Sequence, residues 1–258
     1  MKLVPSWWGG TFSVLLSRRW WWSTLLVMLV MLVMTRLGFW QLERAAQRKA
    51  RNEYVSTQLA ADPVPLGSLD LGSLALEQLA FRAVTERGKY DHTQQVILLG
   101  QIFRGQPGVN LITPLVMPVS DRAVLVNRGW IPYDATESSQ LSQFDEPGPQ
   151  FVSGRIRLPQ PGIVNAGASQ SAQLEVYRLD IEVLQAQMTY KLLPFYLQQQ
   201  PSERGGNEFP KRIPLQFELK DGPHLGYAIQ WFFFVPLLGG GYLHLLRKSV
   251  VIGKVTTT

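Results

Sequence analysis

The stretch WWWSTLLVMLVMLVMTRLGFW, residues Trp20–Trp40, decides the fold of this chain. Its centre, Leu25–Met34, is an unbroken apolar run, and tryptophans stand at both ends. As an α-helix rising about 1.5 Å per residue, the stretch is long enough to cross the hydrocarbon layer of a bilayer. Aromatic residues at both ends match the interfacial belts of membrane proteins. The sequence therefore predicts a first transmembrane helix over residues 20–42.

A second apolar segment, Tyr227–Leu246, lies near the other end of the chain and carries no formal charge. Arg247 and Lys248 follow it directly, as is usual at the edge of a membrane. We predict a second transmembrane helix over residues 227–246. After the first segment, bulky residues stand where a signal peptidase would need small ones, which favours an uncleaved anchor over a signal peptide.

The distribution of charge predicts the orientation of the two helices. The 258-residue chain has a net charge of +6, which could indicate nucleic-acid binding. Residues 43–226, however, hold all 19 acidic residues and have a net charge of −1, whereas both ends are purely basic. By the positive-inside rule, the tails at residues 1–19 and 247–258 lie in the cytoplasm. We therefore expect a multi-pass protein of the bacterial inner membrane, with residues 43–226 in the periplasm and no nucleic-acid partner.

Residues 43–226 have the pattern of an α+β domain between the two helices. The first helix is expected to continue outward as a polar helix to about Leu59, since polar side chains recur at i,i+4 spacing. Further along, short runs rich in β-branched or aromatic residues are separated by Gly and Pro, a pattern typical of an antiparallel sheet or a small barrel. These runs are Val96–Gln101, Val124–Asn127, Phe151–Leu158, Leu174–Arg178 and Phe195–Gln199. One short helix is expected over Leu179–Met188, with Asp180 as its N-cap.

Few residues suit catalysis or metal binding. There is no cysteine, which excludes disulfides, zinc–cysteine sites and iron–sulfur clusters, and there are three histidines. His92 fits a turn, and His244 fits the membrane interface. The sequence contains no glycine-rich phosphate loop, no paired histidine motif and no carboxylate pair with a telling spacing. Enzyme chemistry therefore has little support, although catalytic groups need not be close in sequence.

His224 is the histidine of greatest interest. We expect it in the first turn of the second helix, which Asp221 would cap, with Tyr227 and Trp231 on the same helix face. A neutral imidazole beside two aromatic rings could ligate haem iron while the rings pack on the porphyrin. The simpler alternative is an interfacial histidine within an aromatic belt.

Two arginines near the outer end of the first helix are also candidates. Arg36 lies within the apolar stretch, where a long side chain can reach the membrane surface, and this is its simplest role. The alternative is a counter-ion for an anionic group, such as a haem propionate or a partner's carboxylate. Arg44 lies two turns further out on nearly the same face.

The stretch Asn127-Arg128-Gly129-Trp130 ends the strongest predicted strand. Gly129 indicates an unusual backbone angle, and Trp130 indicates a large contact in a core or an interface. On physical grounds a strand-ending turn is the simpler interpretation, and a partner-binding surface is the alternative.

Taken in order, several of these stretches resemble the surfeit locus protein family of cytochrome c oxidase assembly factors, over residues 20–246. One departure is Gly222-Pro223, which stand where family members often have an asparagine pair, so the hydrogen-bond partner of His224 can differ here. The matching stretches are LGFWQLER (37–44), FRAV (81–84), GKYDH (88–92), TPL (113–115), LVNRGWIP (125–132) and HLGY (224–227) with Trp231.

This resemblance implies a non-enzymatic assembly factor that helps to mature the haem-copper (cytochrome c) oxidase. Some bacterial members bind haem a through a histidine at the start of the second span, which by position is His224, the expected ligand of the haem iron. The implied partners are the oxidase catalytic subunit, other assembly factors and membrane lipid. The residues expected around a transiently bound haem a are His224, Tyr227, Trp231, Arg36, Trp40 and Arg44, and those expected at a partner surface are Asn127, Arg128, Gly129 and Trp130.

Two other functions fit the same sequence. A scaffold would bind an oxidase subunit through the same surfaces without holding haem. A membrane-anchored periplasmic enzyme would need a polar cleft with perturbed titratable groups in residues 43–226.

Overall fold

A computed structural model of the chain describes residues 15, 17–72, 75–118, 120–136, 138–160, 174–201, 209–215, 217 and 219–255. It divides into two compact units. The first comprises Met1–Tyr54 and Leu219–Thr258, and the second comprises Val55–Glu218. We describe the first as the helical unit and the second as the barrel unit.

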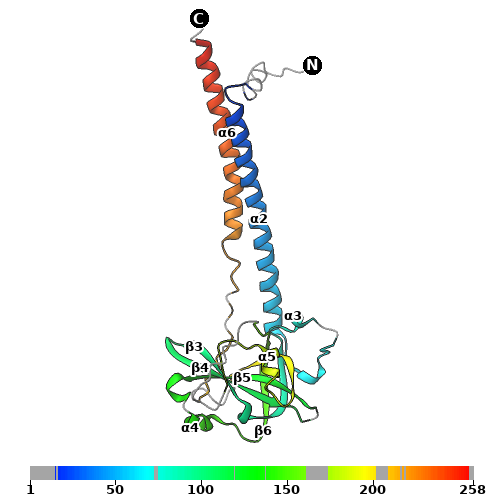
Figure 1. The fold of residues 1–258 in the computed structure, drawn as a ribbon. Coiled ribbons are helices and arrows are strands. Elements are labelled where there is room, and N and C mark those ends of the chain that lie inside the picture. Colours follow the sequence, from blue (N-terminus) through cyan, green and yellow to red (C-terminus); the bar gives the residue numbers. More distant parts are fainter. Residues whose placement is uncertain are drawn as a thin grey trace. The chain divides into compact units, whose positions relative to one another are not determined.

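The helical unit is built from α6 (His224–Val255) and most of α2 (Trp21–Ala60), whose last residues, from Val55 on, belong to the barrel unit. Both are long and apolar enough to cross a membrane by length and composition. The predicted outward continuation of the first helix is confirmed, because α2 runs without a break from the apolar stretch to Ala60. Figure 1 shows the two helices side by side.

Contacts at several heights align α2 and α6 as an antiparallel pair. Near the start of α2, the Tyr242 hydroxyl lies 2.7 Å from the hydroxyl of Thr24. Further along α2, a Cβ on Gly38 would stand 2.8 Å from the Phe232 ring, so only glycine permits the two helices to approach this closely here. Less exposed positions of α2 recur every three or four residues, as in the seam of a packed helix pair. They include Thr24, Val27, Met31, Met34, Gly38, Gln41 and Ala45, and Ser23, Val30, Thr35 and Leu37 next to them are also partly buried.

The barrel unit contains eight strands among its described residues. They are β1 (Val64–Pro65), β2 (Ala83–Tyr90), β3 (Val96–Phe103), β4 (Gln106–Val116), β5 (Arg122–Pro132), β6 (Pro149–Arg157), β7 (Leu174–Val176) and β8 (Lys191–Gln199). Its short helices are α3 (Leu76–Leu79), α4 (Ser138–Leu141) and α5 (Ile181–Gln185), with 3₁₀ turns η1 (Leu66–Ser68), η2 (His92–Gln94), η3 (Tyr133–Thr136) and η4 (Ser142–Phe144).

The strands form one mixed sheet in the order β1-β2-β6-β8-β5-β4-β3-β7. An additional antiparallel pairing of β2 with β4, at Lys89↔Val116 and Tyr90↔Leu115, closes five of the strands into a ring. The predicted α+β class with a sheet or small barrel is therefore confirmed. The pairing is not purely antiparallel, because β1–β2, β3–β7 and β5–β8 run parallel.

Burial along the strands follows their places in the sheet. Residues Ala123–Ile131 of β5 are all buried, as expected for a central strand covered on both faces. In β6 buried and partly exposed residues alternate from Val152 onward, as in a strand with one solvated face. The interior of the ring is filled by a cluster that includes Leu66, Tyr90 and Phe195.

The helix α5 begins at Ile181, and the Asp180 carboxylate accepts hydrogen bonds from the backbone N–H groups of Glu182 and Val183. The predicted N-cap is confirmed, although the helix is shorter than Leu179–Met188.

Candidate functional site

His224 is the first residue of α6 and is partly buried against α2. Its Nδ1 lies 2.9 Å from Oε1 of Gln41. An amide oxygen can only accept a hydrogen bond, so Nδ1 is the protonated nitrogen and donates a hydrogen bond to Gln41. The neutral imidazole then has its lone pair on Nε2, the state that binds a metal.

Nε2 of His224 makes no hydrogen bond within the part of the chain that the structure describes. Gln41 therefore fixes the tautomer and the ring orientation of His224, as a hydrogen-bond partner behind a metal-binding histidine does. The sequence analysis did not single out Gln41. The signal that could have found it is the register of the two helices, which places residue 41 opposite the start of α6.

The segment before His224 is held to α2 by a side-chain hydrogen bond and turns at a glycine. Asp221 accepts a hydrogen bond from the Asn52 side chain at 3.2 Å, and Gly222 has a positive φ of 74°. The prediction that Asp221 caps α6 is wrong, because the helix begins later and the Tyr227 N–H donates to the Pro223 carbonyl. The Asp221 carboxylate instead stabilises the position of the chain just before His224.

The aromatic candidates flank the line of contact between the two helices. Tyr227 and Trp231 each come one position before a residue that faces α2, and Trp40 comes one position before Gln41. In an antiparallel pair, a backward step along either helix turns toward the same side of the pair. The three aromatic residues therefore line one side, next to His224.

The two arginine candidates lie one turn on either side of Trp40. The Arg44 guanidinium stacks over the Trp40 ring at 5.6 Å. Arg36 is exposed and makes no hydrogen bond or ion pair with the described residues, so its side chain is available to an anion. No contact joins Arg36, Tyr227 or Trp231 directly to His224 in the described segments. The helical geometry brings Tyr227 and Trp231 to one side, whereas Arg36, two residues from both Met34 and Gly38, lies on the face of α2 that points away from α6.

This side of the helix pair offers three kinds of group. It has one imidazole nitrogen with an available lone pair, open aromatic surface and the guanidinium group of Arg44, which stacks on Trp40. Trp40 is 40% exposed and Tyr227 is 49% exposed, so much of their aromatic surface is not buried by other residues of the chain. Such a set suits a flat apolar molecule with a metal centre and anionic substituents.

The stretch Asn127–Trp130 lies in the interior of the barrel unit. Arg128 and Trp130 are 0% and 2% exposed, and the Asn127 side chain accepts the backbone N–H of Gly129 at 3.1 Å. A Cβ on Gly129 would stand 2.5 Å from the Lys211 carbonyl, and its φ is 134°. Partner binding by these residues stays a prediction. Because Arg128 and Trp130 are buried, a partner could contact their side chains only if the residues that cover them moved away.

Arg128 is the centre of a buried polar network. Its guanidinium donates to Glu146 Oε1 at 3.0 Å, to Gln95 Oε1 at 3.1 Å and to the Phe144 carbonyl. Glu146 also accepts from Arg212 at 3.0 Å, so one carboxylate serves two guanidinium groups. A buried charge with this many partners is compensated where it lies.

Glu146 and Arg212 were not among the predicted site residues. Glu146 stands before Pro147 in a proline- and glycine-rich turn, and Arg212 lies within residues 201–214, whose sequence predicts a loop. Nothing in the spacing of either residue indicates a partner far away in the chain.

His92 belongs to the same network rather than to a ligand site. Its Nε2 accepts the backbone N–H of Glu146 at 3.2 Å, and its Nδ1 then donates to the Asp145 carboxylate at 3.1 Å. The 3.4 Å approach of Arg128 Nη1 to Nδ1 is consequently a contact between two donors. With both ring nitrogens engaged, His92 has no lone pair for a metal. His244 is exposed on α6.

Titratable groups near this network are shifted by burial and by each other. Burial, together with the Glu146 charge, raises the pKa of Tyr90. Burial and the neighbouring Asp91 raise the pKa of Tyr190, whose hydroxyl donates to that carboxylate at 2.7 Å. Burial opposes ionisation of Asp91, but hydrogen bonds from Thr93 and Tyr190 outweigh it and lower its pKa.

Comparison with known proteins places the chain among relatives. The model of the SURF1 family matches residues 28–235. Surfeit locus protein 1 of Takifugu rubripes is 27% identical over 48% of this chain, and the match spans 57% of that protein. A SURF1-like protein of Mycobacterium tuberculosis is 26% identical over 82% of this chain and 78% of its own length. A SURF1-like protein of Monosiga brevicollis is 25% identical over 85% of this chain and 86% of its own length. The family model covers well over half of the chain and both termini of the matched region lie in the long helices, so the chain belongs to the SURF1 family.

Proposed function

We propose that this chain is a non-enzymatic assembly factor for haem-copper (cytochrome c) oxidase that binds haem a transiently at His224. The observation that carries the proposal is the hydrogen bond from His224 Nδ1 to Gln41, which leaves Nε2 with its lone pair beside open aromatic surface. Membership of the SURF1 family supports the choice of an assembly factor over an enzyme.

The residues of the helical unit suit haem a in three respects. His224 would ligate the iron through Nε2, and Trp40, Tyr227 and Trp231 would pack on the macrocycle. Arg36 and Arg44 would pair with the two propionates, because a guanidinium matches a carboxylate in charge and shape. When bound, haem supplies the redox-active iron centre that the oxidase needs, and this chain would hold it and release it to the catalytic subunit.

The proposed placement is in a bacterial inner membrane, with spans at residues 20–42 and 227–246. The basic tails would lie in the cytoplasm and residues 43–226 in the periplasm. His224 would then stand at the periplasmic surface of the bilayer. Its proposed partners are the oxidase catalytic subunit, other assembly factors and the surrounding lipid.

The first test is the haem content of the protein purified after co-production with the enzymes of haem a synthesis. Wild type is expected to show a haem absorption band, and His224→Ala is expected to lose it. His244→Ala is the matched control, since His244 is an exposed histidine on the same helix and should leave haem content unchanged. Equal haem in wild type and His224→Ala would contradict the ligand assignment.

Gln41→Leu tests the partner of the imidazole. Removing an outer-shell partner weakens ligation by roughly 10-fold or more, so haem content should fall while the protein remains folded. Gln41→Glu retains an acceptor for the Nδ1 proton and should retain haem. If Gln41→Leu matched wild type, the hydrogen bond would have no part in ligation.

The scaffold alternative predicts a different result. A stoichiometric complex with an oxidase subunit, recovered from cells that make no haem a, would favour a scaffold over a haem carrier. Deletion of the gene tests both readings, because normal oxidase activity together with normal bound haem a would contradict any role in assembly.

A further inference from the structure

The barrel unit has a cavity at one end of its ring of strands. The cavity has a volume of about 310 Å³. Met117 follows the end of β4, Arg122 begins β5, and Leu193 lies near the start of β8. Because β5 and β8 are parallel and β4 runs against them, all three side chains belong to the same end of the ring. The mouth of a small barrel is a recurrent place for ligand sites.

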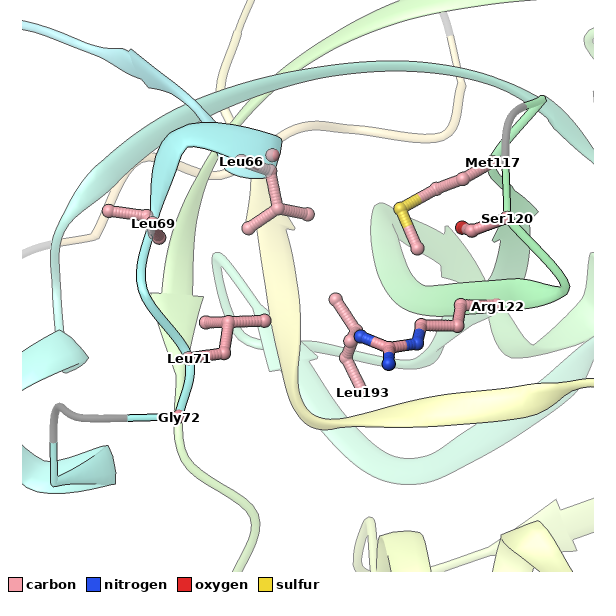
Figure 2. Close-up of a pocket in the computed structure, with 9 residues that line it drawn as sticks. Leu66, Leu69, Leu71, Gly72, Met117, Ser120, Arg122 and Leu193 are labelled. Carbon is pink, nitrogen blue, oxygen red and sulfur yellow. The ribbon is translucent and has the colours of Figure 1, made fainter.

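The floor and walls of this cavity are apolar. Four leucines and one methionine line it, and two of the leucines, Leu66 and Leu193, are also members of the buried cluster inside the ring. Leu69 and Leu71 approach from the loop after η1 and pack against the same cluster. Figure 2 shows the leucines and Met117 around one open space.

One charged side chain belongs to the cavity lining. The Arg122 guanidinium reaches into the open space beside Leu193 (Figure 2). Among the residues that the structure describes, no acidic side chain lines the cavity, and the Arg122 side chain forms no hydrogen bond or ion pair. Ser120 adds a hydroxyl next to it. The cavity thus combines hydrocarbon surface with a single cation that has no partner of its own.

We propose that this cavity binds an unbranched aliphatic monocarboxylate, with its hydrocarbon chain on the leucines and its carboxylate paired with Arg122. A planar guanidinium receives a carboxylate through two parallel hydrogen bonds, and one positive charge balances one carboxylate. A phosphate monoester would bring close to two negative charges to a single arginine, and an amine would be repelled. The site is separate from the residues of the proposed haem function.

The absence of cysteine from the chain makes a direct occupancy test possible. Ser120→Cys places the only thiol of the full-length, detergent-solubilised protein at the cavity. The rate of its reaction with N-ethylmaleimide is then measured with octanoate as the probe. At a probe concentration about four times its dissociation constant, occupancy should slow the reaction roughly fivefold.

Three comparisons decide the outcome. Octanoate should protect the thiol, whereas octanol and octylamine should protect it far less. In the Ser120→Cys, Arg122→Gln double variant the protection by octanoate should disappear, and in Ser120→Cys, Arg104→Gln it should persist, because Arg104 is an exposed arginine outside the cavity. Protection that is absent, equal for octanol, or unchanged by Arg122→Gln would overturn the proposal.

Discussion

The residues that resemble the family motifs are exposed in the helical unit and buried in the barrel unit. In the helical unit the motif residues Trp40, Tyr227 and Arg36 are exposed and leave their functional groups available. In the barrel unit the motif residues Arg128 and Trp130 are buried, and the charge of Arg128 is fully compensated inside the chain.

This difference separates binding from architecture. A side chain that is exposed and without a partner is available to a ligand, whereas a buried one with several partners mainly stabilises the fold. Two stretches that resemble the same family can therefore have different roles in it. The variants below test this division, because each should damage one unit and leave the other intact.

The largest effect is expected for Arg128→Met in the barrel unit. The substitution leaves Gln95, the Phe144 carbonyl and part of the Glu146 carboxylate without their donor, and breaking such a buried pair costs about 3 kcal/mol of unfolding free energy. Pulse proteolysis of the full-length protein in urea measures this loss. Arg104→Met, at an exposed turn, should change stability by less than about 0.5 kcal/mol. Equal stability of the two variants would mean that the network does not support the fold.

A smaller effect is expected for Arg155→Ala, which removes the tie between β6 and the end of α2. The guanidinium donates to the carbonyls of Gln58 and Leu59 at 3.0 Å and to that of Phe81 at 3.1 Å. The carbonyls of Gln58 and Leu59 are at the C-terminus of α2, where a cation is favourable, and burial lowers the pKa of this arginine. We expect a loss of about 1–2 kcal/mol in the same proteolysis assay. Arg155→Lys keeps the charge but lacks the two guanidinium nitrogens that donate together, so its unfolding free energy should lie between those of wild type and Arg155→Ala.

Gly38→Leu should damage the helical unit alone. The added side chain would overlap the Phe232 ring and force α2 and α6 apart, at a cost of about 1–2 kcal/mol for overpacking. Cross-linking of cysteines placed at Ser23 and Tyr242, in a chain that has no other thiol, reports the pairing. The matched control is Gly240→Leu, since nothing lies within 4 Å of a Cβ at that position. A Gly38→Leu protein that cross-links as well as the control would show that the helices do not pack at this height.

The smallest effect concerns pH and Asp91. Hydrogen bonds hold its pKa in the folded protein below the ordinary value of an aspartate, against the opposing effect of burial, so the ionised carboxylate stabilises the fold at neutral pH. This contribution is lost as the pH falls through the folded pKa. Wild type should therefore be more stable than Asp91→Asn near pH 7, and the difference should vanish at lower pH. Urea midpoints at several pH values measure it, and an unchanged difference at low pH would contradict the assignment.

The helical unit could be predicted from sequence more completely than the barrel unit. Hydrophobicity and aromatic ends determine α2 and α6 locally, and the continuation to Ala60 follows from polar residues at helical spacing. The partner of His224 could not be predicted, since Gln41 meets it only through the register of two distant helices.

In the barrel unit, local rules found strands but not their limits. Glycine and proline were expected to separate the strands, yet Pro107 and Gly108 lie inside β4, and Gly129 lies inside β5. A Cβ on Gly108 would stand 2.4 Å from the Trp130 indole, so this glycine is required by close packing across the sheet. At such positions, tertiary packing outweighs the local tendency of glycine to end a strand. The strands β1, β2 and β4 were not predicted.

The parallel pairing of β5 with β8 has a consequence for how the chain folds. The strands β3, β4 and β5 follow one another and can pair as soon as they have been made. The ring cannot be completed until Lys191–Gln199 arrives, because β8 must insert between β5 and β6. Pairing of distant segments is slow, since the entropy of closing a long loop is lost before contacts compensate for it. A nascent chain would therefore expose the unpaired side of β5 while its first apolar helix is already complete, and this is the interval in which a chaperone or a wrong partner could bind it.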